Sequence, residues 1–290
     1  MHRVSSSLIG LSVANLELCL DGRASGMRMA LPECHAKFLQ AGAADGGLVL
    51  NVREGALRPS GAWRPLYHPS ETWELWQDEA GRYVFVTSQH WPPRRQVSVD
   101  AGFRWGEVLG EFGAGTNSAE GLYPLRDLDV QLFANWLAES GDLILHAAGV
   151  SVDGRGYCFA GASGAGKSTL AAAFAEASGS TVLGEDNLIL RYVDGRFWIF
   201  GTPWHLNPAR CNPLGAPLDK LFFPDRAACH GARPCPPLDG ITRLLQTAFV
   251  PYYRPAAVAR ILGRLALLAE RVPFFTLGYR LGSDVMELVQ

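Results

Sequence analysis

The stretch Gly161-Ala162-Ser163-Gly164-Ala165-Gly166-Lys167-Ser168 decides the fold class of the second half of this chain. It matches the pattern G-x-x-x-x-G-K-[ST] at every fixed position. Phosphate is a compact polyanion, so a loop that binds it must turn several backbone N–H groups inward. Gly164 and Gly166 allow the positive φ angles that this requires, and a following helix adds the positive end of its dipole. The stretch therefore predicts a phosphate-binding loop between a strand and a helix.

The loop positions have expected roles with a nucleoside triphosphate. Lys167 is expected to place its ammonium group on the β- and γ-phosphates, and the Ser168 hydroxyl to bind Mg²⁺. An apolar strand ending at Ala160 and an alanine-rich helix over 167–177 flank the loop, as the motif requires. We therefore expect ATP and Mg²⁺ as cofactors, with the nucleotide held at Gly161, Ser163, Gly164, Ala165, Gly166, Lys167, Ser168 and Thr169.

An acidic pair follows the loop at a short interval. Glu185 and Asp186 begin 18 positions after Lys167 (185 − 167), at the end of an expected strand over 181–184. One strand–loop–helix–strand unit of this length returns the pair to the loop. Two adjacent carboxylates can divide the chemistry, because one holds magnesium while the other accepts a proton from an attacking hydroxyl. His146 lies in the strand leading to the loop, where a phosphate-side role and a core position are equally favoured.

The residues up to 123 have a different pattern from the rest. They are rich in Gly, Pro and Trp, and alternating runs at 72–76 and 82–86 predict antiparallel hairpins. The tryptophans of this region are expected to pack rather than to stack nucleic-acid bases, and they are Trp63, Trp73, Trp76, Trp91 and Trp105. The sequence thus predicts an α/β protein in which a β-rich N-terminal half, residues 1–123, serves to present a substrate.

The second domain is expected at 124–290. Asp127 and Gly141 are predicted to begin and end its first helix, and Pro255 to open a late helix. The buried face of that late helix is predicted to comprise Val258, Ile261, Leu262, Leu265 and Leu268. Its arginines are expected to form a solvated face rather than a charge clamp on a transition state, and they are Arg254, Arg260 and Arg264.

Composition excludes some classes of partner. The chain has 290 residues, a formal net charge of -2, 48% hydrophobic and 19% charged residues, which is typical of a soluble globular protein. It has no basic cluster and no apolar stretch long enough for a bilayer, so neither nucleic acid nor membrane is expected as a partner. We expect a cytoplasmic protein whose oligomeric state, homo-oligomer included, the sequence leaves open.

At these residues the sequence resembles the HPr kinase/phosphorylase group, whose catalytic domain is related to phosphoenolpyruvate carboxykinase. The resemblance covers residues 124 to 225 and includes the loop and the acidic pair. It extends to Leu145-His146-Ala147, Asn187-Leu188-Ile189-Leu190 and Gly201-Thr202-Pro203-Trp204-His205. It implies a C-terminal P-loop domain like that of HPr kinase and phosphoenolpyruvate carboxykinase, which carries the catalytic residues.

Position by position, the resemblance implies that Lys167 and Ser168 serve ATP and magnesium and that Asp186 is a magnesium ligand. Glu185 stands where the family has its catalytic aspartate, and His146 near the transferred phosphate. The chain lacks the arginine- and glycine-rich stretch that follows this core in true HPr kinases, so HPr itself is not the expected substrate. His205, with Trp204 and Thr202, either lines the acceptor pocket or packs at a strand end.

The expected function is transfer of the γ-phosphoryl group of ATP to a hydroxyl, with serine favoured, of a protein or peptide. Related enzymes without the HPr-binding stretch include kinases that modify ribosomally made peptides, which makes such a peptide a reasonable acceptor. Two alternatives remain. One is a carboxykinase-like enzyme, and the other is a P-loop ATPase or regulatory module in which Glu185 activates water.

Overall fold

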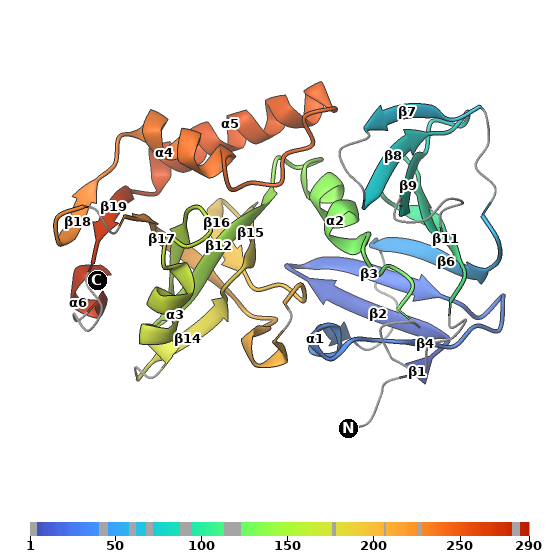
Figure 1. The fold of residues 1–290 in the computed structure, drawn as a ribbon, viewed down its shortest axis with the longest axis horizontal. Coiled ribbons are helices and arrows are strands. Elements are labelled where there is room, and N and C mark those ends of the chain that lie inside the picture. Colours follow the sequence, from blue (N-terminus) through green and yellow to red (C-terminus); the bar gives the residue numbers. More distant parts are fainter. Residues whose placement is uncertain are drawn as a thin grey trace. The chain divides into compact units, whose positions relative to one another are not determined.

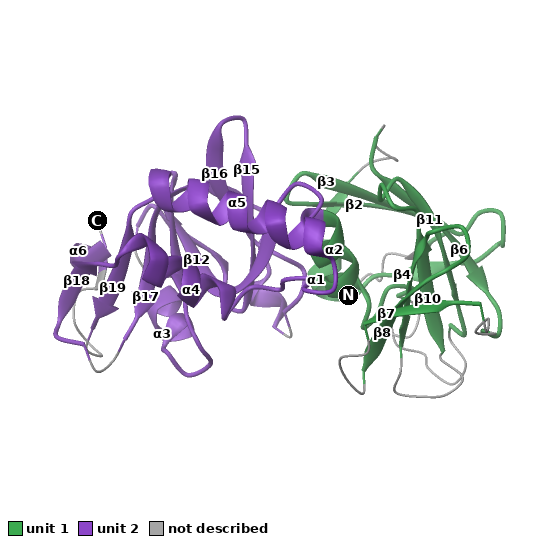
Figure 2. Ribbon diagram, turned by 90° about the horizontal axis from the view of Figure 1, so that it is seen from above, with its two compact units in different colours: residues 1–136 green, residues 137–290 purple. Residues whose placement is uncertain are grey.

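The computed structural model describes residues 5–40, 46–57, 62–67, 72–87, 94–112, 123–175, 178–205, 207–225, 228–279 and 285–289. The chain divides into two compact units, Met1–Trp136 and Leu137–Gln290 (Figure 2). Both contain strands and helices, which confirms the expected α/β composition. In the part of the chain that the structure describes, no helix has the length and apolar character needed to cross a bilayer.

Unit 1 is built on one large sheet (Figure 1). Its strands are antiparallel to their neighbours, except that β6 runs parallel to both β3 and β11. A short β1–β4 pair and helix α1 (Glu33–Ala36) complete the unit. The sheet order is β5 (Leu39–Gln40), β2 (Leu8–Val13), β3 (Leu16–Asp21), β6 (Leu48–Glu54), β11 (Trp105–Gly110), β10 (Arg95–Val99), β9 (Tyr83–Thr87), β8 (Trp73–Gln77) and β7 (Arg64–Tyr67), and the pair is β1 (Ser5–Ser6) with β4 (Met29–Ala30).

The alternating runs of unit 1 form the predicted hairpin. In β8 and β9, Leu75 lies opposite Phe85, and both are fully buried. The tryptophans mostly pack, with Trp63 against Trp76 at 6.4 Å between ring centroids. Trp105 is 48% exposed beneath the Arg82 guanidinium. Trp91 lies outside the described residues.

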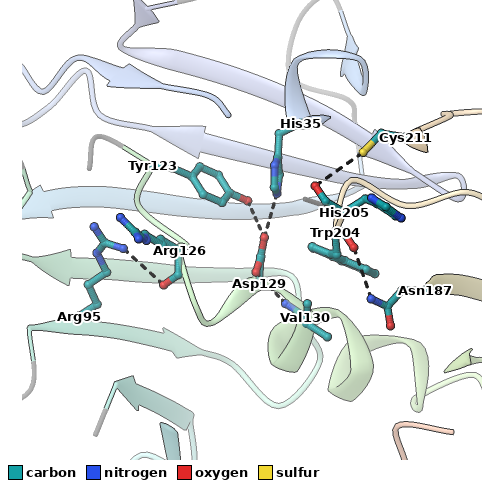
Figure 3. Close-up of polar contacts among 10 residues, drawn as sticks. All are labelled: His35, Arg95, Tyr123, Arg126, Asp129, Val130, Asn187, Trp204, His205 and Cys211. Atoms are coloured by element: carbon teal, nitrogen blue, oxygen red, sulfur yellow. Dashed lines mark hydrogen bonds and ion pairs between the residues drawn. The ribbon is translucent and has the colours of Figure 1, made fainter. Parts of the chain in front are cut away.

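Helix α2 (Asp129–Leu137) belongs to unit 1 apart from its last residue, so the boundary falls after Trp136 and not after residue 123. The reason is the side chain of Asp129, whose Oδ2 atom lies 2.9 Å from His35 Nε2 and accepts a hydrogen bond from the Tyr123 hydroxyl (Figure 3). These buried contacts fasten the start of the helix to α1 of the first unit. Asp127, the predicted cap, has φ 67° and lies in the preceding turn.

Unit 2 has a second sheet, in the order β13-β12-β15-β16-β17-β19-β18, with β14 also paired to β12 (Figure 1). A parallel pairing of β13 with β17 closes a ring of strands. The bounds are β12 (Leu143–Val152), β13 (Arg155–Ala160), β14 (Ser180–Gly184), β15 (Asn187–Val193), β16 (Arg196–Phe200), β17 (Gly215–Pro224), β18 (Gly231–Pro234) and β19 (Phe274–Gly278). The helices are α3 (Lys167–Ala175), η1 (Pro208–Arg210), α4 (Pro237–Leu245), α5 (Pro255–Arg271) and α6 (Val285–Val289).

The two faces of β12 pack in two different hydrophobic clusters. Leu143 and Leu145 pack with α4 and α5, whereas Val150 and Val152 pack with α3. Successive strand residues point to opposite faces, so one strand can serve both layers. A register shift between Gly149 and Val150 changes the pattern where β14 joins.

The buried face of α5 differs from the predicted one. It consists of Ala257, Ile261, Leu265 and Leu268, whereas Leu262 is 45% exposed. Positions 261 and 262 are about 100° apart around a helix, so only one of them can face the sheet directly. The arginines of this segment fasten it to the chain after α2, because Arg254 and Arg260 pair with Glu139 and Arg264 donates to the Ser140 carbonyl. These contacts are structural.

Candidate functional site

The glycine-rich loop leaves β13 and enters α3 through two residues in the left-handed region. Gly164 has φ 81° and Gly166 has φ 93°. A Cβ added to Gly164 would meet nothing within 4 Å, so backbone conformation, and not space, requires glycine there. The Leu170 N–H donates to the Gly166 carbonyl and starts the helical ladder. The two glycines thus have the positive φ angles that the sequence predicted.

Lys167 folds back over the start of the loop. Its side chain is buried, and its Nζ donates to the carbonyl oxygens of Gly161 at 2.8 Å and Ala162 at 3.0 Å. Burial lowers the pKa of this ammonium group, and the nearby charge of Asp186 acts in the opposite direction. Tyr279 supports the loop from the end of β19, since its hydroxyl lies 3.3 Å from the Ala165 carbonyl.

The loop forms one side of a cavity of about 420 Å³, which we call the loop cavity. The predicted residues of the loop, the acidic pair and the preceding strand meet here. The cavity is lined by His146, Ser163, Gly164, Gly166, Lys167, Ser168, Thr169, Glu185, Asp186 and His205. Two of the predicted nucleotide-binding positions, Gly161 and Ala165, do not line it and instead border a second cavity.

The sheet brings His146 and Asp186 together. His146 in β12 is the pairing partner of Asn187 in β15, which places it beside the acidic turn. Its Nδ1 lies 2.9 Å from Asp186 Oδ1, and the Ala147 N–H donates to the Asp186 carbonyl. Of the two positions that the sequence left open for His146, the structure gives the one facing the loop cavity.

Glu185 has a partner that sequence reasoning missed. Its side chain is only 9% exposed, and Oε1 accepts a hydrogen bond from Arg210 Nη1. Arg210 ends η1, whose first turn is capped by the Asn207 side chain and has Pro208 at its first position. The Asn-Pro step is a helix-start signal, and it was the available indication that the chain turns back here.

The residues of the segment after β16 differ in role, since some are buried and one lines the loop cavity. Thr202 and Trp204 are buried, with the Thr202 hydroxyl donating to the Asn187 carbonyl at 2.8 Å. The Asn187 side-chain amide donates in turn to the Trp204 carbonyl (Figure 3). His205 alone of the three lines the loop cavity.

Gly201 begins this segment at a close crossing of three backbones. A Cβ at Gly201 would lie 2.0 Å from the Asn212 carbonyl oxygen and 2.3 Å from that of Leu183. Real Cβ atoms do not approach backbone this closely, so glycine is required. The crossing fixes the end of β14, immediately before Glu185, against the chain on both sides of η1.

The residues present fit a magnesium–nucleotide complex. Hard cations take oxygen ligands, and Mg²⁺ is held by only one or two protein groups together with phosphates and water. The Ser168 hydroxyl and the Asp186 carboxylate border the same cavity as Lys167 and supply such oxygens. Among the described residues, no cluster of three or more His, Cys, Asp or Glu side chains is arranged to hold a metal by itself.

No protein-family model and no curated protein matches the chain. Among solved structures, it is similar to the Hpr(Ser) kinase/phosphatase from Coxiella burnetii. The two share 13% sequence identity, the match covers 50% of this chain and 85% of that chain, and the TM-score is 0.31. A likeness of this size does not establish a common fold, so membership of the HPr kinase group stays a prediction and the function rests on the chain's own residues.

Proposed function

We propose that the protein is an ATP-dependent kinase that transfers the γ-phosphoryl group to a hydroxyl, with serine favoured, of a protein or peptide. The observation that carries this proposal is the composition of the loop cavity. A loop lysine, a loop serine and two carboxylates border one space, and these are the groups that phosphoryl transfer uses for charge stabilisation, metal binding and proton acceptance.

In this proposal each side chain has one task. Lys167 places its charge on the β- and γ-phosphates, and the backbone N–H groups of the loop hold the phosphates. Ser168 and Asp186 would hold Mg²⁺, which when bound neutralises charge on the phosphate oxygens. His146, bonded to Asp186, orients that carboxylate.

In the proposed transfer step, Glu185 is the proton acceptor. The acceptor oxygen forms a bond to the γ-phosphorus as the bond from that phosphorus to the bridging oxygen of ADP breaks. The proton of the acceptor hydroxyl moves to the Glu185 carboxylate. Glu185 must first exchange its hydrogen bond with Arg210 for one to the acceptor, so Arg210 controls when the base is free.

The test is transfer from γ-labelled ATP. We expect purified protein with Mg²⁺ to label a serine-bearing peptide or a protein fraction from its own host. Without acceptor it should bind ATP yet release phosphate well below the roughly 1–100 per second typical of kinases, because an incomplete site keeps water from reacting. Fast phosphate release that needs no acceptor, is lost in Glu185→Gln and leaves no labelled product would establish an ATPase instead.

A further inference from the structure

A second cavity adjoins the start of the loop. Its volume is about 280 Å³, and it is lined by Ala160, Gly161, Ala162, Ala165, Phe223, Pro224, Asp225, Arg243, Gln246 and Thr247. Gly161 and Ala162 are the residues whose carbonyls bind the Lys167 ammonium, and Lys167 lines the loop cavity. The backbone of Gly161 and Ala162 therefore forms a wall of the second cavity and contacts Lys167 of the loop cavity, which it does not itself line. We call this second cavity the acceptor cavity.

The lysine identifies which end of the nucleotide lies at this wall. In the proposed complex the ammonium of Lys167 reaches the β- and γ-phosphates, while the N–H groups of the loop and helix start hold the α- and β-phosphates. The ammonium lies against Gly161 and Ala162, so the γ-phosphate end lies there too. An acceptor that attacks the γ-phosphorus in line with the leaving oxygen must approach from this end.

A backbone hydrogen bond connects the two cavities on another side. The His146 N–H donates to the Thr247 carbonyl at 2.7 Å, and Leu145 forms a β-bridge with Ala248. His146 lines the loop cavity and Thr247 lines the acceptor cavity. The segment after α4 is thus held directly against the strand that borders the phosphates.

The charged groups of the acceptor cavity indicate what it binds. Arg243, in the last turn of α4, is half-buried, and its guanidinium lies 5.4 Å from the centroid of the Phe223 ring. Among the described residues, its hydrogen bonding consists of one contact of 3.4 Å to Thr276 Oγ1. A guanidinium has five N–H donors in a fork that matches a carboxylate.

The remaining polar groups suit a peptide. Asp225 is the other charged residue that lines the cavity, and it already has an interaction of its own within the protein. The Gln246 side chain offers both a donor and an acceptor. Main-chain amides alternate donors and acceptors, so such groups hold a peptide without reading its sequence. The arginine then supplies selection by charge.

We propose that the acceptor cavity binds an acidic side chain of a peptide, next to the serine that enters the loop cavity. This inference rests on the proposed kinase function and names the class of its acceptor. Arg243 pairs with the carboxylate of that side chain and thereby sets the preference for acidic peptides. Nucleotide binding does not involve Arg243.

The test uses three synthetic peptides with one serine in a glycine frame, flanked on both sides by Asp, by Ala or by Lys. Wild-type protein and Arg243→Gln, Arg243→Glu and Arg233→Glu variants are compared for transfer of label from γ-labelled ATP and, separately, for ATP affinity. Arg233 is an exposed arginine of β18 outside both cavities and serves as the control. Thermal unfolding of each variant verifies that it is folded.

Wild type and Arg233→Glu should phosphorylate the Asp peptide at least about tenfold more efficiently than the Lys peptide, as expected for one charge-assisted contact. Arg243→Gln should lose this preference, and Arg243→Glu should reverse it, all with unchanged ATP affinity. Phosphorylation without charge preference, or a preference for the Asp peptide that remains in Arg243→Glu, overturns this inference. The proposed kinase function would still hold in either case. Weaker ATP binding in Arg243→Glu also overturns it, because the cavity would then hold nucleotide. Bound ATP with no peptide or host protein labelled rejects the kinase itself.

Discussion

Replacing Lys167 by methionine separates catalysis from folding. Methionine keeps the unbranched side chain up to the ε position and removes the charged Nζ. The two hydrogen bonds from Nζ to the Gly161 and Ala162 carbonyls are lost, at about 1.5–3 kcal/mol each for a charged donor. Burial disfavours the charged ammonium and so lowers the pKa of Lys167, and methionine removes this penalty. Since these effects oppose each other, we expect the free energy of unfolding to change by no more than about 1–2 kcal/mol.

Phosphoryl transfer should respond very differently. Removal of one preorganised donor from a charged transition state costs roughly 10²–10³ in rate, or about 2.7–4 kcal/mol. The assay is the rate of transfer to a labelled acceptor, measured beside thermal unfolding. Lys220→Met is the matched control, because the Lys220 ammonium also donates to a backbone carbonyl, that of Val289 at 2.9 Å, but does not line the loop cavity. Near wild-type transfer in Lys167→Met would refute the reasoning, whatever its effect on unfolding.

Three further results are expected. Asp186→Asn should weaken the dependence of the rate on magnesium, whereas Glu185→Gln should keep ATP binding and lose transfer; a magnesium titration showing the reverse would exchange their roles. Gly164→Ala meets no steric clash but forces φ 81° on an L-residue, so calorimetry should find weaker ATP binding by about 1–3 kcal/mol, and unchanged affinity would contradict this. Burial lowers the pKa of Lys167 in the folded state, so the native state loses this proton at a lower pH than the unfolded state does. Between the two pKa values, the contribution of this group to stability rises with pH. ATP affinity falls over the same range. Titrating ATP affinity against alkaline pH checks this, and Lys167→Arg should not show the fall.

The sequence predicted local features best where one residue type determines the backbone. Gly164 and Gly166 indicated the conformation of the loop, and the alternation around Leu75 and Phe85 indicated a hairpin. The acidic pair was placed correctly beside the loop because the interval from Lys167 allows little more than one helix and one strand. Short separations leave few geometries, so local pattern is sufficient.

Contacts between distant segments were not predictable in this way. Nothing near Glu185 indicates that Arg210 will bond to it, because the contact depends on the crossing at Gly201 and on η1. The pairing of Thr247 with His146 requires the path of α4 to be known. The boundary was placed too early because the turn at Pro124 resembles a linker, whereas the buried carboxylate of Asp129 joins the next helix to the first unit.

The crossing at Gly201 restricts how the site can move. With the Asn212 and Leu183 carbonyls within 2.0 and 2.3 Å of any added Cβ, the backbones of β14, β16 and the segment after η1 cannot slide past one another without separating. The Asn212 amide adds a bond to the Val182 carbonyl at 3.1 Å. In the proposed kinase, exchange of Arg210 for an acceptor at Glu185 is then a rotation of side chains on a fixed frame. Loop rearrangements extend to microseconds, and this exchange requires none of them. We therefore expect a slow step in turnover to come from binding, from chemistry or from product release.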